Sequence, residues 1–272
     1  MATKRRIDSR EALPDWERVL ACAARLQQLV PGTVLVGGSA AAVHVRHRRS
    51  AGADHVSSDL KQRFDEVLAD LEAVAGWKTA RIRRPVLILG SLDGVETGVR
   101  QLIRSRPLAT IRIKVGGSRV TLPTLAEMLC IKAALVLARN ATRDYIDFAA
   151  LAHALGKRAI AALARMDQLY PQPQEESTLQ QLLRQLSDPR PYDLADLNLE
   201  SYKVLAPRWR NWETVGEECA RVAVRLAEGL LGKFRRSTGA GEDGALGATE
   251  VKRWARKRMA RGAAQRRPKG RR

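Results

Sequence analysis

The chain has 272 residues and a mass of 30.1 kDa, which is enough for one large domain or two modest ones around a buried core. Its hydrophobic fraction of 45% excludes wholesale disorder. Lys and Arg number 48 against 29 Asp and Glu, and the resulting net charge of +19 favours a polyanionic partner, either nucleic acid or an anionic membrane.

Cysteine usage and hydropathy favour the cytoplasm. Cys22, Cys130 and Cys219 are widely spaced and form neither a zinc-binding pattern nor a disulfide framework, which suits a reducing compartment. No hydrophobic run follows the basic start, so we expect no signal peptide. No stretch approaches the roughly 18 consecutive apolar residues that span a bilayer. We therefore expect a soluble, cytoplasmic protein with no membrane association.

The N-terminal half shows an α/β pattern. Apolar residues at helical spacing predict a first helix over 9–29, and a short β-rich run follows at 33–36. That run ends in Gly37-Gly38-Ser39, after which an alanine-rich segment at 40–45 predicts a second helix. The other elements expected in this half are a short strand at 53–56, an amphipathic helix at 57–76, and strands at 78–82, 86–89, 94–101, 110–115 and around Val120.

The second half predicts helices, because Thr124 and Thr142 are good N-caps for long apolar-periodic segments. From about residue 235 the sequence is rich in Gly, Ala, Ser and Arg and has few apolar anchors. We expect an α/β domain of the α+β kind at 1–122, a helical domain at 123–232, and a disordered basic tail at 233–272 with 14 Lys and Arg against 3 acids. The helices expected in the second domain lie at 124–139, 142–155, 157–169, 175–186 and 208–231.

Gly37-Gly38-Ser39 is the first segment with a chemical signature. Two glycines between a strand and a helix let the backbone approach a phosphate, and the helix N-terminus offers free N–H groups. Asp54 follows 15 residues after Ser39 on a short apolar strand, where a carboxylate suits a Mg²⁺ ion on a nucleoside triphosphate. The plainer interpretation is ordinary turn chemistry for the glycines, and a solvated carboxylate or a helix N-cap for Asp54.

Two blocks of sequence, taken together, point to one family. The first block has Gly37-Gly38-Ser39, His44 and His47-Arg48-Arg49-Ser50 before Asp54; the second has Pro123-Thr124-Leu125-Ala126-Glu127-Met128-Leu129, then Lys132, Arg139 and Arg143-Asp144-Tyr145-Ile146-Asp147. Over residues 30–155 this order resembles the nucleotidyltransferase-fold proteins of the AbiEii/AbiGii toxin family.

The resemblance implies a nucleotidyltransferase-like mixed sheet with helices and Mg²⁺-dependent binding of a nucleoside triphosphate (NTP). It also implies transfer of a nucleotide to RNA, in several relatives to the 3′ end of tRNA, and a cognate antitoxin protein as partner. Asp144 would orient Lys132 or the substrate. The implied catalytic residues are Asp54, Lys132 and Asp144, and the implied nucleotide-binding residues are Gly37, Gly38, Ser39, Lys132 and Arg139.

The implied metal site departs from the family pattern, which has two acids separated by one residue. Asp54 matches the second acid, but Gly52 stands in place of the first. A third acid is expected on a following strand, where Glu96 is the nearest equivalent and Asp93 and Gly98 are the alternatives. The resemblance thus leaves Asp54 and Glu96 to bind Mg²⁺ weakly, since hard cations need several anionic oxygens.

The helical residues also have structural interpretations. Lys132 lies in an apolar run, from which its charged end can reach water along its own aliphatic stem. Asp144 and Asp147 stand at the expected start of a helix, where acids stabilise the helix dipole.

Two functions remain in competition. We expect a nucleotidyltransferase toxin-like enzyme that transfers a nucleotide from an NTP to an RNA acceptor. The alternative is a non-catalytic nucleic-acid-binding protein on a degenerate nucleotidyltransferase fold, which Gly52 and the basic tail favour. A third class, the enzymes that modify aminoglycosides, is disfavoured because small cationic substrates prefer acidic pockets.

Overall fold

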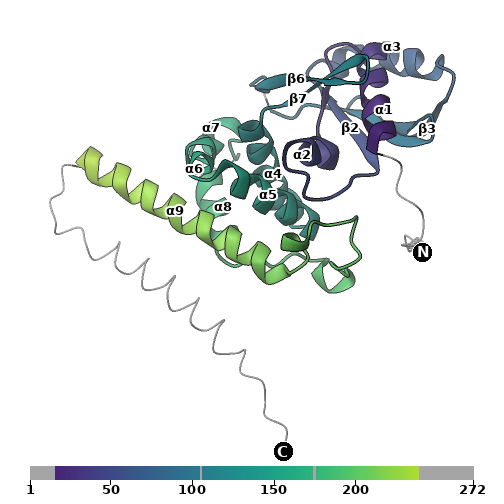
Figure 1. Ribbon diagram of the computed structural model, residues 1–272. Helices are drawn as coiled ribbons and strands as arrows, with labels where there is room; N and C mark the ends of the chain where they lie inside the picture. Colours follow the sequence, from purple (N-terminus) through teal and green to yellow (C-terminus); the bar gives the residue numbers. More distant parts are fainter. Residues whose placement is uncertain (1–15, 105, 174–175, 239–272) are drawn as a thin grey trace, which may run out of the picture.

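A mixed five-stranded sheet forms the N-terminal half of the protein. The computed structural model describes residues 16–104, 106–173 and 176–238 (Figure 1). Strands β2 and β5 at the centre run parallel, and the other neighbours are antiparallel. The strand order is β1 (Val34–Leu35), β2 (Gly52–Ser57), β5 (Val95–Gln101), β4 (Leu87–Leu92) and β3 (Trp77–Arg83).

Helices cover one face of this sheet. Helix α1 (Trp16–Leu29) packs against β2 and β5, and α3 (Leu60–Glu72) packs against β3 and β5. Both helices were expected, but α3 starts later than residue 57 because Ser57 is still the last residue of β2 and Asp59 is the N-cap. Helix α2 (Gly37–Val45) lies at the end of β1 and contacts β2 and two helices of the second half.

A separate hairpin, β6 (Thr110–Val115) and β7 (Ser118–Pro123), joins the sheet to the helical half. It packs against α1, where the Gln27 side-chain amide bonds both the N–H and the carbonyl of Thr121 at 2.8 and 2.7 Å. The hairpin confirms the strands expected at 110–115 and around Val120 and shows that they stand outside the main sheet.

The C-terminal half is helical, as expected. Helices α4 and α5 pack on each other beside the sheet, and the Thr124 hydroxyl caps α4 by accepting from the N–H of Glu127. The helix expected at 157–169 is divided in two, because residues 164 and 165 form a turn. The helices are α4 (Leu125–Arg139), α5 (Thr142–Leu155), α6 (Arg158–Leu163), α7 (Met166–Leu169), α8 (Thr178–Ser187) and α9 (Trp212–Thr238).

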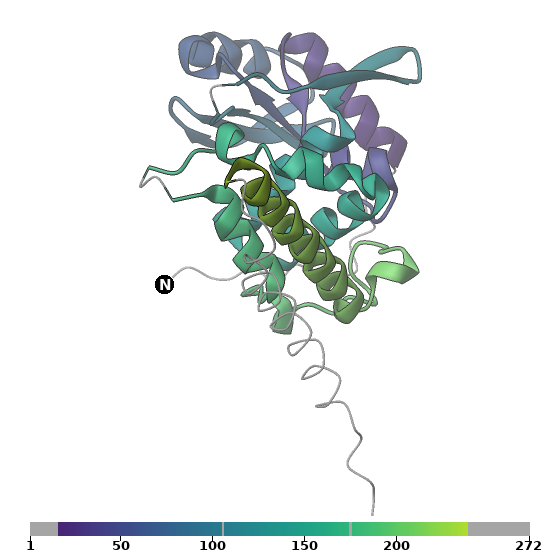
Figure 2. The same ribbon diagram turned by 90° about the vertical axis from the view of Figure 1, so that its left-hand side faces the viewer.

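Helix α9 lies across the other C-terminal helices, as Figure 2 shows, and contacts α5, α6 and α8. It extends seven residues past the expected end at Leu231, so the first residues of the expected tail are helical. Residues 239–272, which make up the rest of that tail, lie outside the described residues. The expected disorder of the tail and the expected division into three parts therefore stay predictions.

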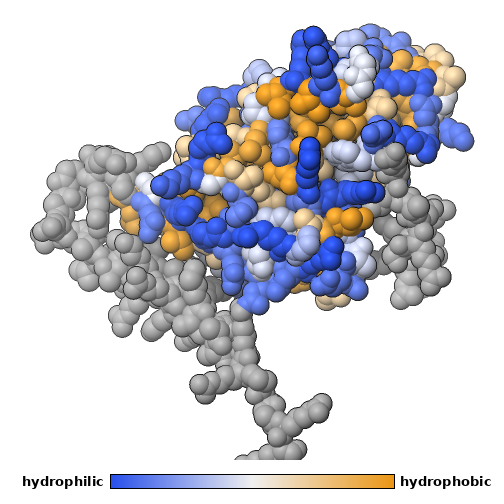
Figure 3. Space-filling model, viewed as in Figure 1, coloured by the Kyte–Doolittle hydropathy of each residue, from blue (hydrophilic) through white to orange (hydrophobic). Residues whose placement is uncertain are grey.

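One apolar core serves both halves. Buried side chains form a single cluster that runs from α1 through the sheet and α4 into α5 and α9. Cys22, Cys130 and Cys219 are buried and free. Figure 3 shows an uneven surface on one face, with a hydrophobic area where β7 and α2 lie in Figure 1 and many hydrophilic side chains over the helical half. Within the described ranges, no helix is long and apolar enough to cross a membrane.

Candidate functional site

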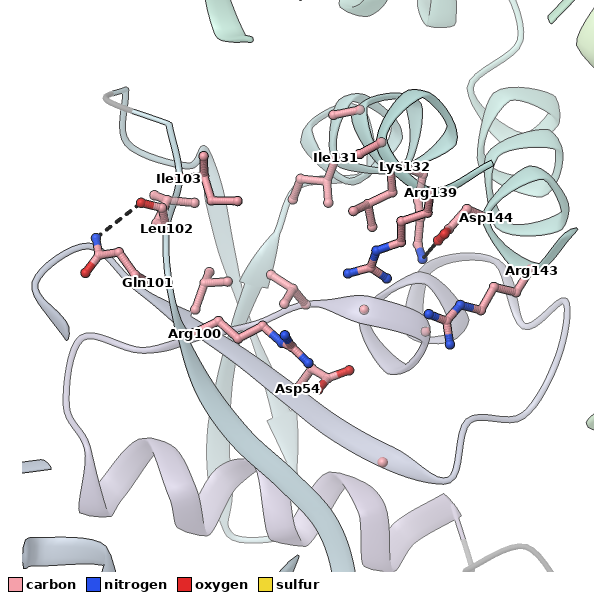
Figure 4. A pocket seen from close by; sticks show the side chains of 18 of the residues that line it. Asp54, Arg100, Gln101, Leu102, Ile103, Ile131, Lys132, Arg139, Arg143 and Asp144 are labelled. Carbon is pink, nitrogen blue, oxygen red and sulfur yellow. Dashed lines mark hydrogen bonds and ion pairs between the residues drawn. The ribbon is translucent and has the colours of Figure 1, made fainter. Parts of the chain in front are cut away.

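A cleft of about 1330 Å³ separates the open face of the sheet from helices α4 and α5. Side chains from both walls point into it (Figure 4). Its lining is strongly basic, with nine cationic side chains against three acidic ones, so the cleft favours anionic ligands. The cations are Arg48, Lys78, Arg81, Arg100, Arg104, Lys132, Arg139, Arg143 and Lys203, and the acids are Asp54, Glu96 and Asp144.

The junction of β1 and α2 forms one end of the sheet wall. Gly37 is the first residue of α2 and has a φ of +73°, which L side chains rarely adopt. A Cβ at Gly37 would lie 3.1 Å from Oδ2 of Asp54, so the glycine also brings the backbone close to that carboxylate. No side chain among the described residues caps α2, and its N-terminal N–H groups therefore remain available to an anion.

Ser39 differs from Gly37 and Gly38 in its place relative to the cleft. It is fully buried, and its hydroxyl donates to the backbone carbonyl of Gly52. Gly37 and Gly38 line the cleft, whereas Ser39 is not among the lining residues. The described structure thus gives the Ser39 hydroxyl a role in holding α2 against β2, and its role in nucleotide binding stays a prediction.

Asp54 and Glu96 are exposed on the cleft face of the sheet. In the register of β2 and β5, Asp54 lies opposite Gly98 and Glu96 lies opposite Gly52, so both carboxylates project from the same face. Arg100 stands on this face as well, and Figure 4 shows its guanidinium pointing towards Asp54. Of the alternatives to Glu96, Asp93 lies in the turn between β4 and β5 and bonds Arg25, and Gly98 is packed against the backbone of β4.

Gly52, which replaces the first acid of the family pattern, has no room for a side chain. A Cβ there would lie 2.9 Å from the backbone carbonyl oxygen of Glu96. The described residues contain no group of three His, Cys, Asp or Glu side chains that could hold a metal ion. Asp54 and Glu96 are the carboxylates that the sheet wall offers, and Mg²⁺ commonly takes one or two carboxylates together with substrate phosphates. This donor set fits an ion that arrives with a phosphorylated substrate.

Lys132, expected on a helix of the second block, is at the centre of a buried charge cluster. Its Nζ lies 2.9 Å from Oδ1 of Asp144 and 2.7 Å from Oδ2 of Asp147. Asp147 also receives a two-pronged contact from Arg48, at 2.6 and 2.9 Å, and a 2.6 Å hydrogen bond from Nε2 of His47. The resemblance implies that Asp144 orients Lys132 or the substrate, and in the structure Asp144 forms an ion pair with Lys132.

The charges in this cluster stabilise one another. Burial by itself raises the pKa of Asp147, but the charges of Arg48 and Lys132 and the hydrogen bond from His47 hold that pKa well below its usual range. Oδ2 of Asp144 is buried and has no hydrogen-bond partner among the described residues. One carboxylate acceptor at the base of the cleft is therefore unused.

The helical wall adds exposed guanidinium groups. Arg139 ends α4 and Arg143 begins α5, and both extend into the cleft towards Asp54 and Arg100 (Figure 4). Arg139 was expected here because the family resemblance implies that it binds the nucleotide. Arg143 belongs to the second sequence block but was given no role there. Arg100 and Lys203 were not singled out, because lone charged residues carry no periodic signal.

Comparison with known proteins gives partial matches. No family model matches the chain. The chain is 28% identical over 218 residues to the mycolic acid-containing lipids exporter MmpL11 of Mycolicibacterium smegmatis, and the matched region covers 79% of this chain and 22% of the exporter. It is 36% identical over 129 residues to the heme uptake protein MmpL11 of Mycobacterium tuberculosis, and the matched region covers 46% of this chain and 13% of that protein. The chain thus spans less than a quarter of the length of these curated relatives.

Two solved structures match the chain with low scores. One is a candidate nucleotidyltransferase from H. pylori, with a TM-score of 0.48 and 12% identity over 79% of this chain and 94% of that one. The other is an antigenic nucleotidyltransferase-like protein from Paracoccidioides brasiliensis, with a TM-score of 0.36 and 17% identity over 62% of this chain and 94% of that one. Both scores are low, so the chemistry of the site has to be argued from this chain's own residues.

Proposed function

We propose that the cleft binds an NTP and transfers its nucleotide to an RNA acceptor, as a nucleotidyltransferase does. One observation carries the proposal. The exposed carboxylate of Asp54 lies against the glycine N-terminus of α2, on the wall of a cleft whose opposite wall presents Arg139 and Arg143. Free N–H groups, guanidinium groups and a carboxylate around one space are the groups that a triphosphate and its cation require.

The proposed binding mode assigns the two walls different tasks. The N–H groups of Gly37 and Gly38 and the positive end of α2 bind phosphate oxygens on the sheet side. Arg139 and Arg143 bind phosphate oxygens on the helical side with charge-assisted hydrogen bonds. Lys132 stays fixed by Asp144 and Asp147 and supplies positive charge at the base of the cleft.

Asp54 and Glu96 would hold a Mg²⁺ ion carried on the phosphates. When bound, such an ion neutralises phosphate charge and favours departure of the leaving group. In the proposed transfer, a hydroxyl oxygen of the RNA acceptor forms a bond to the α-phosphorus while the bond from that phosphorus to the bridging oxygen breaks. Pyrophosphate leaves, and the hydroxyl proton passes to water. The chain's residues act by positioning and charge, as phosphoryl transfer requires.

The resemblance to the AbiEii/AbiGii family supports the finer parts of this proposal. It suggests tRNA as the acceptor and a cognate antitoxin as the restraining partner. The net charge of +19 is consistent with an RNA substrate.

A second function is favoured by one specific observation. Because Gly52 leaves no room for the first metal-binding acid, the scaffold suits a protein that binds a nucleotide or RNA without reacting. The two functions differ in turnover, and a single experiment separates them.

The test incubates the purified full-length chain with each labelled NTP, Mg²⁺ and total tRNA. We expect labelled RNA with the wild type and none with Asp54→Asn. The matched control is Asp70→Asn, which removes an equally exposed carboxylate from α3, away from the cleft. Binding of nucleotide or of tRNA without labelled RNA would support the non-catalytic function. Absence of nucleotide binding, tRNA binding and transfer would contradict both functions.

A further inference from the structure

Lys203 reaches the cleft from a segment that neither sequence block contains. It lies in the irregular stretch between the short helical turns at Leu194–Asp196 and Pro207–Trp209. Its side chain is half-buried and lines the cleft together with Arg143 and Glu96. The proposed function above does not use it.

The backbone at this position is strained. Lys203 and Val204 have consecutive φ values of +43° and +51°, a region that non-glycine residues rarely occupy and that a β-branched valine occupies at a cost. Val204 is 59% exposed, so burial of its side chain does not explain the conformation. Strain of this kind persists only where surrounding contacts impose it, and it occurs often at ligand sites.

A β-turn and two longer-range backbone hydrogen bonds hold this conformation. The N–H of Leu205 donates to the carbonyl of Tyr202 at 3.0 Å and closes the turn, whose central residues are Lys203 and Val204. The N–H of Arg49 donates to the carbonyl of Lys203 at 2.9 Å, and the N–H of Ala206 donates to the carbonyl of His47 at 2.8 Å. The strained segment is thereby fastened to residues 47–49, which also supply two partners of the buried Asp147. These hydrogen bonds hold Lys203 at the edge of the charge cluster, in a backbone conformation with positive φ.

The surroundings of Lys203 are unfavourable for its charge. Burial lowers its pKa, and the charges of Arg48 and Arg143 lower it further, while Asp147 and Glu96 raise it. In the described part of the chain Lys203 makes no ion pair, and its Nζ lies 5.7 Å from the centre of the Tyr202 ring. An anionic ligand in the cleft would therefore stabilise the charge of this half-buried lysine, which faces two arginines and makes no ion pair among the described residues.

We propose that Lys203 binds a phosphate group of the cleft's substrate, side by side with Arg143. The inference rests on the proposed function and adds a third contact on the helical side of the cleft. It also gives the turn a task, because the turn places a long cationic side chain on the lining of the cleft beside Arg143 of α5.

The test measures binding of ATP and of inorganic triphosphate to the full-length chain by calorimetry. We expect Lys203→Met to weaken both about tenfold to a hundredfold, the range for loss of one charge-assisted hydrogen bond. Lys203→Arg should retain most of the affinity. Lys157→Met is the matched control, because Lys157 is an exposed lysine outside the cleft. This variant should bind ATP and triphosphate with the affinity of the wild type.

A proton-uptake measurement separates ligand contact from structural support. A phosphate beside Lys203 raises its pKa, so wild-type binding in the alkaline range should take up protons, seen as a binding heat that depends on the buffer. Lys203→Arg should bind without this uptake, since arginine stays protonated. Val204→Gly should raise the unfolding temperature by relieving the positive φ and should leave the affinity unchanged.

Equal affinities of the wild type and Lys203→Met would overturn the inference. So would equal losses in Lys203→Met and Lys203→Arg, which would assign the residue to structure. If Arg139→Gln weakens binding while Lys203→Met does not, the proposed nucleotide site stands and this inference alone fails. If the wild type binds neither ATP nor triphosphate, the proposed function fails and the inference with it.

Discussion

Asp147 is the residue whose loss should cost the most stability. It is fully buried and its carboxylate contacts three partners, Arg48, Lys132 and His47, at 2.6–2.9 Å. Asp147→Asn keeps the shape of the side chain and removes its charge. Arg48 then has no buried counter-charge of its own, and Lys132 keeps only Asp144.

The magnitude follows from the burial of the partners. Breaking a buried ion pair by removing one partner costs about 3–5 kcal/mol. For a folded region of this size, 1 kcal/mol corresponds to about 2–4 °C in unfolding temperature. We therefore expect Asp147→Asn to unfold roughly 6–20 °C below the wild type at pH 7.

The pH dependence gives a second, independent check. Since the folded pKa of Asp147 is held well below its ordinary value of 3.8, its stabilising contribution is complete above that value and is lost as the pH falls below it. The difference between the wild type and Asp147→Asn should therefore be largest at neutral pH and should narrow below about pH 4.

Thermal unfolding followed by circular dichroism, at pH 7 and below about pH 4, measures the difference in unfolding temperature between the wild type and Asp147→Asn. Asp70→Asn is the control for loss of an exposed carboxylate. An unfolding temperature of Asp147→Asn equal to that of the wild type at pH 7 would refute the reasoning. A gap that stays constant on acidification would show that the charge of Asp147 is not what stabilises the fold.

Three further outcomes are expected. Asp54→Asn should abolish nucleotide transfer and leave the unfolding temperature unchanged, because Asp54 is exposed and its charge serves the ligand; transfer assays and thermal unfolding measure the two effects. Gly52→Asp, which introduces the first acid of the AbiEii/AbiGii pattern, should lose about 1–3 kcal/mol of stability by denaturant titration, because its Cβ would lie 2.9 Å from the Glu96 carbonyl oxygen, and calorimetry should show no gain in Mg²⁺ affinity. A chain ending at Thr238 should bind RNA with a shallower dependence on salt than the full chain, because it lacks most of the cations of the basic tail; equal slopes in a salt series would exclude an RNA anchor there.

The sequence predicted most of the regular elements but placed several boundaries differently. Hydrophobic periodicity located β2, β5, α4 and α5, since each is long enough to show a repeat. The start of α2 at Gly37 was not foreseen, because two glycines between a strand and a helix are typical of a turn. Residues 164 and 165 interrupt the helix expected at 157–169, although no proline or glycine stands there to signal it.

The candidate site was predictable where it follows local pattern. Gly37, Asp54, Lys132 and Arg139 all line the one cleft, as the two sequence blocks suggested. Lys203 could not be found in this way, because its place depends on hydrogen bonds between two irregular segments far apart in the chain. The burial of the Ser39 hydroxyl could not be predicted from the sequence either, since it depends on the carbonyl of Gly52 on the next strand.

The shared core has a mechanical consequence for the cleft. Because the same buried cluster continues from beneath the sheet into α4 and α5, and α2 packs against β2 on one side and α5 on the other, the two walls are parts of a single rigid frame. A hinge between the walls would have to break that packing. An anionic ligand therefore enters between walls that the core holds together, and adjustment to ligands of different shape falls to the long side chains of the half-buried Arg100 and the exposed Arg139 and Arg143.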